Sequence, residues 1–204
     1  MIPFPTPETA GFVMSDTVDY STTPDRTDDR LRADVADLIR AYPDFPSPGV
    51  LFQDLCPVIA TPTMTARIAR AAIRHFAGAF DIVLAVEARG FVFGAVLAQE
   101  SGSPLVLARK SGKLPGRVYR VSYDLEYGRA ALELQCDVLP PSARVLLVDD
   151  VLATGGTLSA AAELVELAHG TVAGYAVVAT LTELGGSARL WRYRGYCTLT
   201  LPTD

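Results

Sequence analysis

The fold class is decided by the thirteen residues Val145-Leu-Leu-Val-Asp-Asp-Val-Leu-Ala-Thr-Gly-Gly-Thr157. They predict a buried strand that ends in two carboxylates, then a turn of small residues that opens a helix through Ala160 to Leu167. Parallel sheets bind their ligands at the carboxyl ends of strands. This segment therefore predicts a binding site together with a fold.

Strands and helices alternate on both sides of this segment. Strands are predicted over Ile82–Val86, Leu105–Ala108 and Tyr175–Leu181, and a helix is predicted over residues 90–99. Apolar strands separated by helices imply parallel crossovers. We therefore expect an α/β fold, with a central, mainly parallel sheet flanked by helices.

Two irregular segments are expected to extend from this sheet. Residues 43–57 are interrupted by prolines and a glycine, which exclude a long helix and predict a small hood with apolar side chains. Residues 110–128 are rich in glycine and basic residues and are long for a compact connection, so we expect a mobile lid over residues 111–128. A half-buried strand over Ala131–Gln135 then returns the chain.

The N-terminal part divides into a tail and a domain. Residues 1–27 contain four prolines and no apolar period, which predicts a flexible tail before a single domain over residues 28–204. The spacing of Leu31, Val35, Leu38, Ile39 and Tyr42 predicts a helix that ends at Pro43. Thr61-Pro62 is typical of the start of a second helix, which presents Met64, Ile68, Ala72 and Phe76 on one face.

Composition excludes several classes of protein. The formal charge is −5 and no block of five or more Lys or Arg residues occurs, which argues against a nucleic-acid partner. No stretch reaches the roughly 18 consecutive apolar residues of a membrane helix. Cys56, Cys136 and Cys197 lie far apart without zinc-site spacing, which indicates reduced thiols and a cytoplasmic protein.

The turn after the two carboxylates has the chemistry of a phosphate site. Residues 153–157, which are Ala153, Thr154, Gly155, Gly156 and Thr157, can direct backbone N–H groups and two hydroxyls at one anion at the start of a helix. Asp149 and Asp150 can accept hydrogen bonds from sugar hydroxyls beside it. Taken alone, the acidic pair also fits a helix cap and the glycines a plain turn, but together they favour ribose 5-phosphate.

The thirteen residues closely resemble the phosphoribosyl pyrophosphate (PRPP) binding motif of the phosphoribosyltransferase family. Three further parts resemble its adenine-specific branch: Asp44 to Pro57, Glu87 to Gly94, and Arg109 to Gly116 with Tyr123 to Gly128. The resemblance spans roughly residues 30 to 200. It implies transfer of the phosphoribosyl group of PRPP to adenine, which yields AMP and pyrophosphate in purine salvage. It also implies a homodimer.

The resemblance also implies roles for residues outside the phosphate turn. The turn of Glu87, Ala88 and Arg89 would bind pyrophosphate, and Arg109, Lys110 and Lys113 would stabilise it as it departs. A surface salt bridge for Arg89 and a solvated loop for the basic trio are the alternatives. No side-chain cluster forms a metal cage, so Mg²⁺ is expected to arrive with PRPP.

The same resemblance assigns the base site and the catalytic residue. Adenine would be bound by Leu51, Phe52, Gln53 and Val151, largely through backbone atoms of the 51–53 loop, because Gln53 stands where many relatives carry arginine. Core packing is the alternative for Phe52 and Val151. Glu126, beside the loop residue Tyr127, would be the catalytic residue, acting on a proton of the purine or stabilising a cationic sugar. A solvated loop glutamate is its alternative.

Two other functions use the same PRPP motif. One is transfer to hypoxanthine, guanine or xanthine, which the adenine-like hood loop and the Leu125-Glu-Tyr-Gly128 segment disfavour. The other is a regulator that binds PRPP without catalysis. Such a regulator needs a nucleic-acid-binding element, and this acidic sequence shows none.

Overall fold

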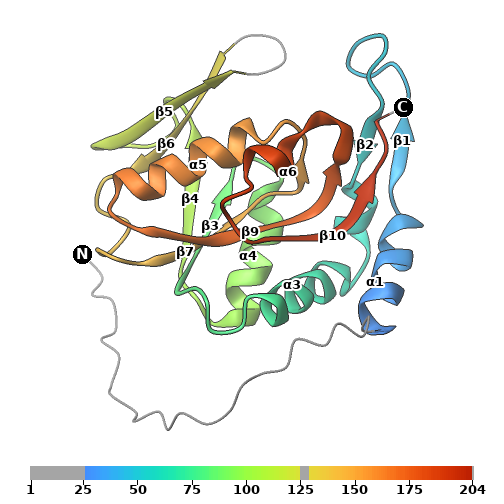
Figure 1. The fold of residues 1–204 in the computed structure, drawn as a ribbon, viewed down its shortest axis with the longest axis horizontal. Helices are drawn as coiled ribbons and strands as arrows, with labels where there is room; N and C mark the ends of the chain where they lie inside the picture. Colours follow the sequence, from blue (N-terminus) through green and yellow to red (C-terminus); the bar gives the residue numbers. More distant parts are fainter. Residues whose placement is uncertain (1–25, 125–128, 204) are drawn as a thin grey trace, which may run out of the picture.

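The computed structural model describes residues 26–124 and 129–203. Their main feature is an eight-stranded sheet with the strand order β10-β9-β7-β3-β4-β6-β5, to which β8 adds by pairing with β9. Helices α5 and α6 cover one face of the sheet, and α1, α3 and α4 cover the other (Figure 1). Each face has its own hydrophobic core. The expected α/β fold is confirmed.

The centre of the sheet is parallel and its far end is antiparallel. The parallel strands are β3 (Ile82–Val86), β4 (Leu105–Lys110), β7 (Arg144–Val148), β9 (Thr171–Leu181) and β10 (Gly195–Leu201). Strands β5 (Val118–Asp124) and β6 (Arg129–Gln135) form an antiparallel hairpin that joins β4 through β6. Because β3 and β7 are adjacent, the segments that follow them meet at one edge of the sheet.

The helices follow the predicted crossovers closely. Their bounds are α1 Arg26–Ala36, α2 Cys56–Ala60, α3 Met64–His75, α4 Gly90–Ser101, α5 Gly156–Leu167 and α6 Gly186–Arg189, with a 3₁₀ turn η1 over Thr182–Leu184. A Cβ atom on Gly94 would overlap the Cβ of Ala85 on β3. Glycine therefore lets α4 lie directly on the strand, which places the start of α4 at the carboxyl end of β3.

No helix within the described residues is long and apolar enough to cross a membrane.

The predicted first helix is wrong beyond Ala36. Residues Arg40–Tyr42 instead form β1, which pairs antiparallel with β2 (Phe52–Asp54). Leu38 and Ile39 are still partly buried against the core of that face, so their apolar spacing reflected packing and not a continued helix. The loop between β1 and β2 forms the predicted hood, seen at the upper right of Figure 1.

The predicted helix start at Thr61 is also wrong. Helix α3 begins at Met64, and its N-cap residue Thr63 makes no side-chain cap hydrogen bond. The Thr61 hydroxyl instead donates to the Pro57 carbonyl oxygen at 2.8 Å, at the end of α2. Thr61 therefore caps the C-terminal end of the short helix α2 and does not start α3.

The predicted lid over residues 111–128 is wrong for residues 118–124, which form strand β5. Tyr119, Val121 and Tyr123 alternate with polar residues, and Val121 is buried in the core beneath α5. Gly112 and Gly116 precede this strand, and together with its basic residues they favour a loop over the alternating pattern of residues 118–124. In Figure 1 the β5–β6 hairpin and the hood extend from the same side of the sheet.

Candidate active site

Two predicted turns meet at the carboxyl ends of β3 and β7. Asp149 and Asp150 follow β7, and the Glu87–Arg89 turn follows β3 and leads into α4 at Gly90. A Cβ atom on Gly90 would lie 2.8 Å from Oδ1 of Asp149, so only glycine permits this approach. The structure thus brings together the residues predicted for ribose and those predicted for pyrophosphate.

Asp149 and Asp150 are both buried. Oδ1 of Asp149 accepts a hydrogen bond of 2.8 Å from the backbone N–H of Asp150. Burial, and then the neighbouring charge of Asp150, raises the pKa of Asp149 well above the usual aspartate value. Two acceptor side chains thus lie at the edge where a sugar diol was expected.

Arg89 joins two parts of the site. Its Nε lies 2.6 Å from Oδ2 of Asp150, yet this buried oxygen has no hydrogen bond of acceptable geometry. The guanidinium carbon also lies 5.6 Å from the ring centroid of Phe52 in the hood. Arg89 does form a salt bridge, but with a buried site carboxylate, so it connects the carboxylate pair to the hood.

The phosphate turn follows the short strand β8 (Val151–Leu152) and lines a cavity of about 60 Å³. The N-cap of α5 is Gly155, which has φ +78° and no side chain to cap the helix. The first backbone N–H groups of α5 are therefore open to an exogenous anion. Gly186 of α6 packs closely against this turn, and a Cβ atom there would overlap the Ala153 carbonyl oxygen. Only glycine therefore allows α6 to contact the turn.

Glu87 organises the basic residues at the end of β4. Its Oε2 accepts hydrogen bonds from the Lys110 backbone N–H at 2.9 Å and Arg109 Nε at 3.3 Å, and its Oε1 accepts one from Arg109 Nη2 at 3.3 Å. Burial alone would raise the pKa of Glu87, but these hydrogen bonds outweigh it and lower the pKa. Arg109 also donates to the Lys113 carbonyl oxygen at 3.2 Å. All three predicted basic residues thus belong to one segment that the Glu87 side chain and Arg109 hold together.

The hood lines a cavity of about 780 Å³. Phe45 and Phe52 contact edge to face with their centroids 5.1 Å apart. The complete lining is Tyr42, Pro43, Asp44, Phe45, Phe52, Asp54, Cys56 and Arg89. Aromatic walls with a few polar groups suit a planar, apolar ring that carries hydrogen-bonding edges. Of this lining, only Phe52 and Arg89 were predicted as site residues.

Three residues predicted for adenine lie differently from Phe52. Leu51 and Gln53 are absent from the lining of the hood cavity, and the Gln53 amide donates to the Pro202 carbonyl oxygen at 3.4 Å. Val151 lines the phosphate cavity instead. Of the four residues predicted for adenine, Phe52 is thus the one that lines the hood cavity. Glu126 and Tyr127 lie outside the described residues.

Replacing Asp149 with asparagine is expected to stabilise the ligand-free protein at neutral pH. Because the folded pKa of Asp149 lies above its unfolded value, stability is lost as the pH rises from the ordinary aspartate range through the raised pKa. Asparagine avoids this loss and keeps the acceptor oxygen for the Asp150 N–H. Thermal unfolding between about pH 4 and pH 8 tests this. A stability difference that does not grow with pH would contradict it.

The comparisons with known proteins agree with this geometry. The family model described as phosphoribosyl transferase domain matches residues 60–194. The chain is 52% identical to the adenine phosphoribosyltransferase of Saccharopolyspora erythraea over 79% of this chain and 87% of the relative. It is 50% identical to that of Renibacterium salmoninarum over 75% and 84%.

Solved structures give the same result. The structure is similar to adenine phosphoribosyltransferase from Rhodothermus marinus, with a TM-score of 0.79 and 38% identity over 85% of this chain and 99% of the other. It is also similar to the Saccharomyces cerevisiae enzyme complexed with an imino-altritol bisphosphate and adenine, with a TM-score of 0.77 and 34% identity over 83% and 97%. The chain therefore belongs to the phosphoribosyltransferase family, within its adenine phosphoribosyltransferase branch.

Proposed function

We propose that this chain transfers the 5-phosphoribosyl group of PRPP to N9 of adenine, giving AMP and pyrophosphate, as a step of purine salvage. The observation that carries the proposal is the position of Arg89. It contacts Asp150 beside the phosphate turn and Phe52 in the hood, so sugar and base would lie on either side of one side chain. Relatives that are 50% and 52% identical over 75% and 79% of this chain bear the name of this activity.

Each part of the edge takes one part of the substrates. The open N–H groups at Gly155 and Gly156 would bind the 5-phosphate, and Asp149 and Asp150 would accept hydrogen bonds from the sugar hydroxyls. Oδ2 of Asp150 is buried beside Arg89 Nε without a hydrogen bond of acceptable geometry, so a sugar hydroxyl would supply one. The bond from the anomeric carbon to pyrophosphate breaks as the bond to N9 forms, with inversion at that carbon.

Basic residues on the pyrophosphate side would stabilise the charge that grows on the leaving group. Arg89, Arg109, Lys110 and Lys113 are the residues that we assign to it, supported by the ordered segment that Glu87 holds. Glu126 is the catalytic residue that we propose, either for proton exchange on the purine or for support of the cationic sugar.

We also propose that Mg²⁺ binds together with PRPP. Within residues 26–124 and 129–203, no group of three or more His, Cys, Asp or Glu side chains could hold a metal. Glu87 is occupied by Arg109 and Lys110, and Asp150 is paired with Arg89, which fits an ion held mainly by substrate phosphates. When bound, the ion would neutralise part of the pyrophosphate charge.

A homodimer in the cytoplasm completes the proposal. Val92 on α4 and Leu105 and Leu107 on β4 are exposed apolar side chains on adjacent elements, which supports burial against a second copy. Sedimentation velocity should then give twice the 21.8 kDa chain mass. The three cysteines are all free thiols, as expected in a reducing compartment.

Competition among bases tests the function. Purified protein is incubated with PRPP, Mg²⁺ and equal amounts of adenine, hypoxanthine, guanine and xanthine, and the nucleotides are separated by chromatography. AMP alone is expected. A different nucleotide would assign the chain to a sister activity, and binding of PRPP without any nucleotide would favour the regulator.

A further inference from the structure

Glu133 is a buried carboxylate outside the site predicted from the sequence. It lies on β6 between Leu132 and Leu134, and it is 1% exposed. An ionised carboxylate at such a position is costly unless hydrogen bonds satisfy both of its oxygens. The partners of Glu133 therefore indicate its purpose.

Those partners come from the turn after β4 and from β5. Oε2 accepts the backbone N–H of Gly112 at 2.9 Å. Oε1 accepts the Ser111 hydroxyl at 2.9 Å and Arg120 Nε at 2.8 Å. Burial alone would raise the pKa of Glu133, but these bonds outweigh it and lower the pKa, so the side chain is ionised at neutral pH.

This chemistry requires a carboxylate. The Gly112 N–H and the Arg120 guanidinium can only donate, and they approach different oxygens. A glutamine has one acceptor oxygen, so its NH₂ group would face one of these donors. Even an isosteric amide thus breaks half of the arrangement.

The held turn separates the predicted basic residues. Strand β4 pairs with β6 only at Arg109 and Lys110, and the next backbone bond runs from Ser111 N–H to the Ala131 carbonyl oxygen at 3.0 Å. Beyond it, the Glu133 side chain fixes Gly112, which has φ +79° and precedes Lys113. The segment from Arg109 to Lys113 is thus held by Glu87 at its start and by Glu133 at its turn.

We propose that Glu133 is a positioning residue, which fixes the Ser111–Gly112 turn so that Lys110 and Lys113 can bind the pyrophosphate group of PRPP. The inference rests on the proposed function. Arg120 balances the charge of Glu133, so the carboxylate holds the turn without repelling the anion. Because AMP lacks the pyrophosphate group, its binding is independent of this turn.

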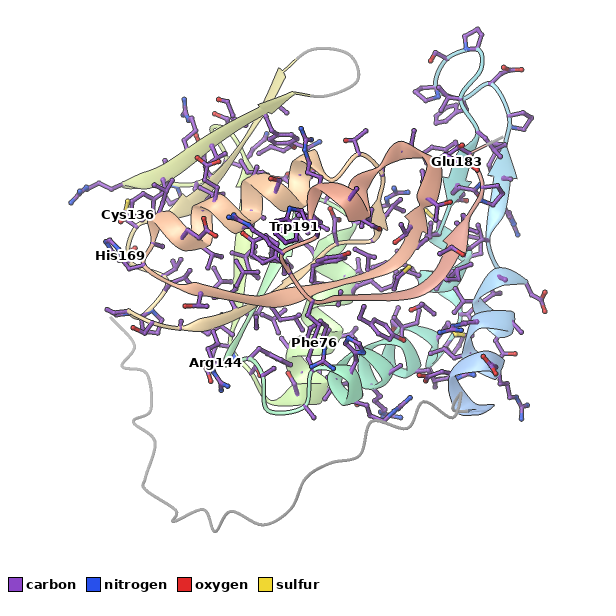
Figure 2. All side chains as sticks on the ribbon, in the orientation of Figure 1. Phe76, Cys136, Arg144, His169, Glu183 and Trp191 are labelled. Atoms are coloured by element: carbon purple, nitrogen blue, oxygen red, sulfur yellow. The ribbon has the colours of Figure 1, made fainter. Side chains whose placement is uncertain are left out.

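Calorimetric titration of Glu133→Gln with Mg²⁺-PRPP and, separately, with AMP tests the proposal. The Kd for PRPP is expected to rise about tenfold, the effect of losing one charge-assisted hydrogen bond, while the Kd for AMP stays within about twofold. Asp81→Asn is the matched control. Like Glu133, Asp81 accepts hydrogen bonds from a guanidinium and from a backbone N–H, and Arg144 supplies both. Figure 2 shows Arg144 at the lower left, away from the hood.

Unchanged PRPP binding, or equal weakening of PRPP and AMP, would overturn the proposal. If Glu133→Gln does not fold, Ser111→Ala removes one partner of Oε1 and should raise the PRPP Kd alone by about threefold. Hydrogen exchange of the Gly112 amide separates this inference from the proposed function. It should accelerate in Glu133→Gln but not in Asp81→Asn, even if the parent protein binds neither ligand. An unchanged rate would contradict the role of Glu133.

Discussion

Asp150→Asn is expected to lower kcat/KM for PRPP by about 10²- to 10³-fold in a protein that remains folded. The substitution replaces the carboxylate whose buried Oδ2 lies beside Arg89 Nε and makes no hydrogen bond of acceptable geometry. The ion pair is lost, and with it the orientation of Arg89 against Phe52. Both the hold on the sugar and the approach of the base should suffer.

Steady-state rates with PRPP and adenine varied separately measure this effect. Circular dichroism and thermal unfolding establish that the variant is folded. Asp81 is paired with Arg144 and precedes β3, so it lies at the amino end of the strand whose carboxyl end forms the site. Asp81→Asn should therefore retain parental rates. A loss in Asp150→Asn of less than about threefold would remove Asp150 from the proposed site.

Gly155→Ala is expected to weaken PRPP and AMP alike, by about 10- to 100-fold. Gly155 has φ +78°, and an added Cβ would lie 3.0 Å from the Gly186 carbonyl oxygen and 3.1 Å from the Gly186 Cα. The backbone of α6 cannot retreat as a flexible side chain would, so the phosphate turn itself must move. Both ligands carry a 5-phosphate, which explains the contrast with Glu133→Gln, where only PRPP should be affected.

Gly102→Ala is the control for backbone strain. Gly102 has φ +69° at the end of α4, with no atom within 4 Å of an added Cβ. It should lower the free energy of unfolding by about 1 kcal/mol and leave both Kd values unchanged. Calorimetry and denaturant titration measure the two effects. Normal ligand binding by Gly155→Ala would contradict the assignment of the phosphate turn.

The parts of the fold that could be predicted carry their signal locally. The strands before Glu87 and Asp149 are continuous apolar runs, and small residues follow them at helix starts, so both turns were identified from single segments. Strand β1 could not be found in this way. Its three exposed residues are a strand because residues 52–54 pair with them, and pairing partners are not visible in the period of one segment.

The site shows the same division. The phosphate turn and the carboxylate pair were predicted from residue type and spacing, but their contacts depend on tertiary structure. For Arg89 the sequence allows an anion site or a surface salt bridge, and in the structure its partner is Asp150, from another strand end. Glu133 looked like the polar member of an alternating strand. Its burial depends on hydrogen bonds from Arg120 and Gly112, which tertiary structure brings to its two oxygens.

The most direct test of the account is a crystal structure of the protein with AMP and pyrophosphate bound. We expect the AMP phosphate at Gly155–Thr157, the ribose hydroxyls on Asp149 and Asp150, and adenine in the hood cavity beside Phe52. Pyrophosphate should contact the segment that Glu87 and Glu133 hold. Density for the base outside the hood cavity, or for the phosphate away from the start of α5, would contradict the proposed site.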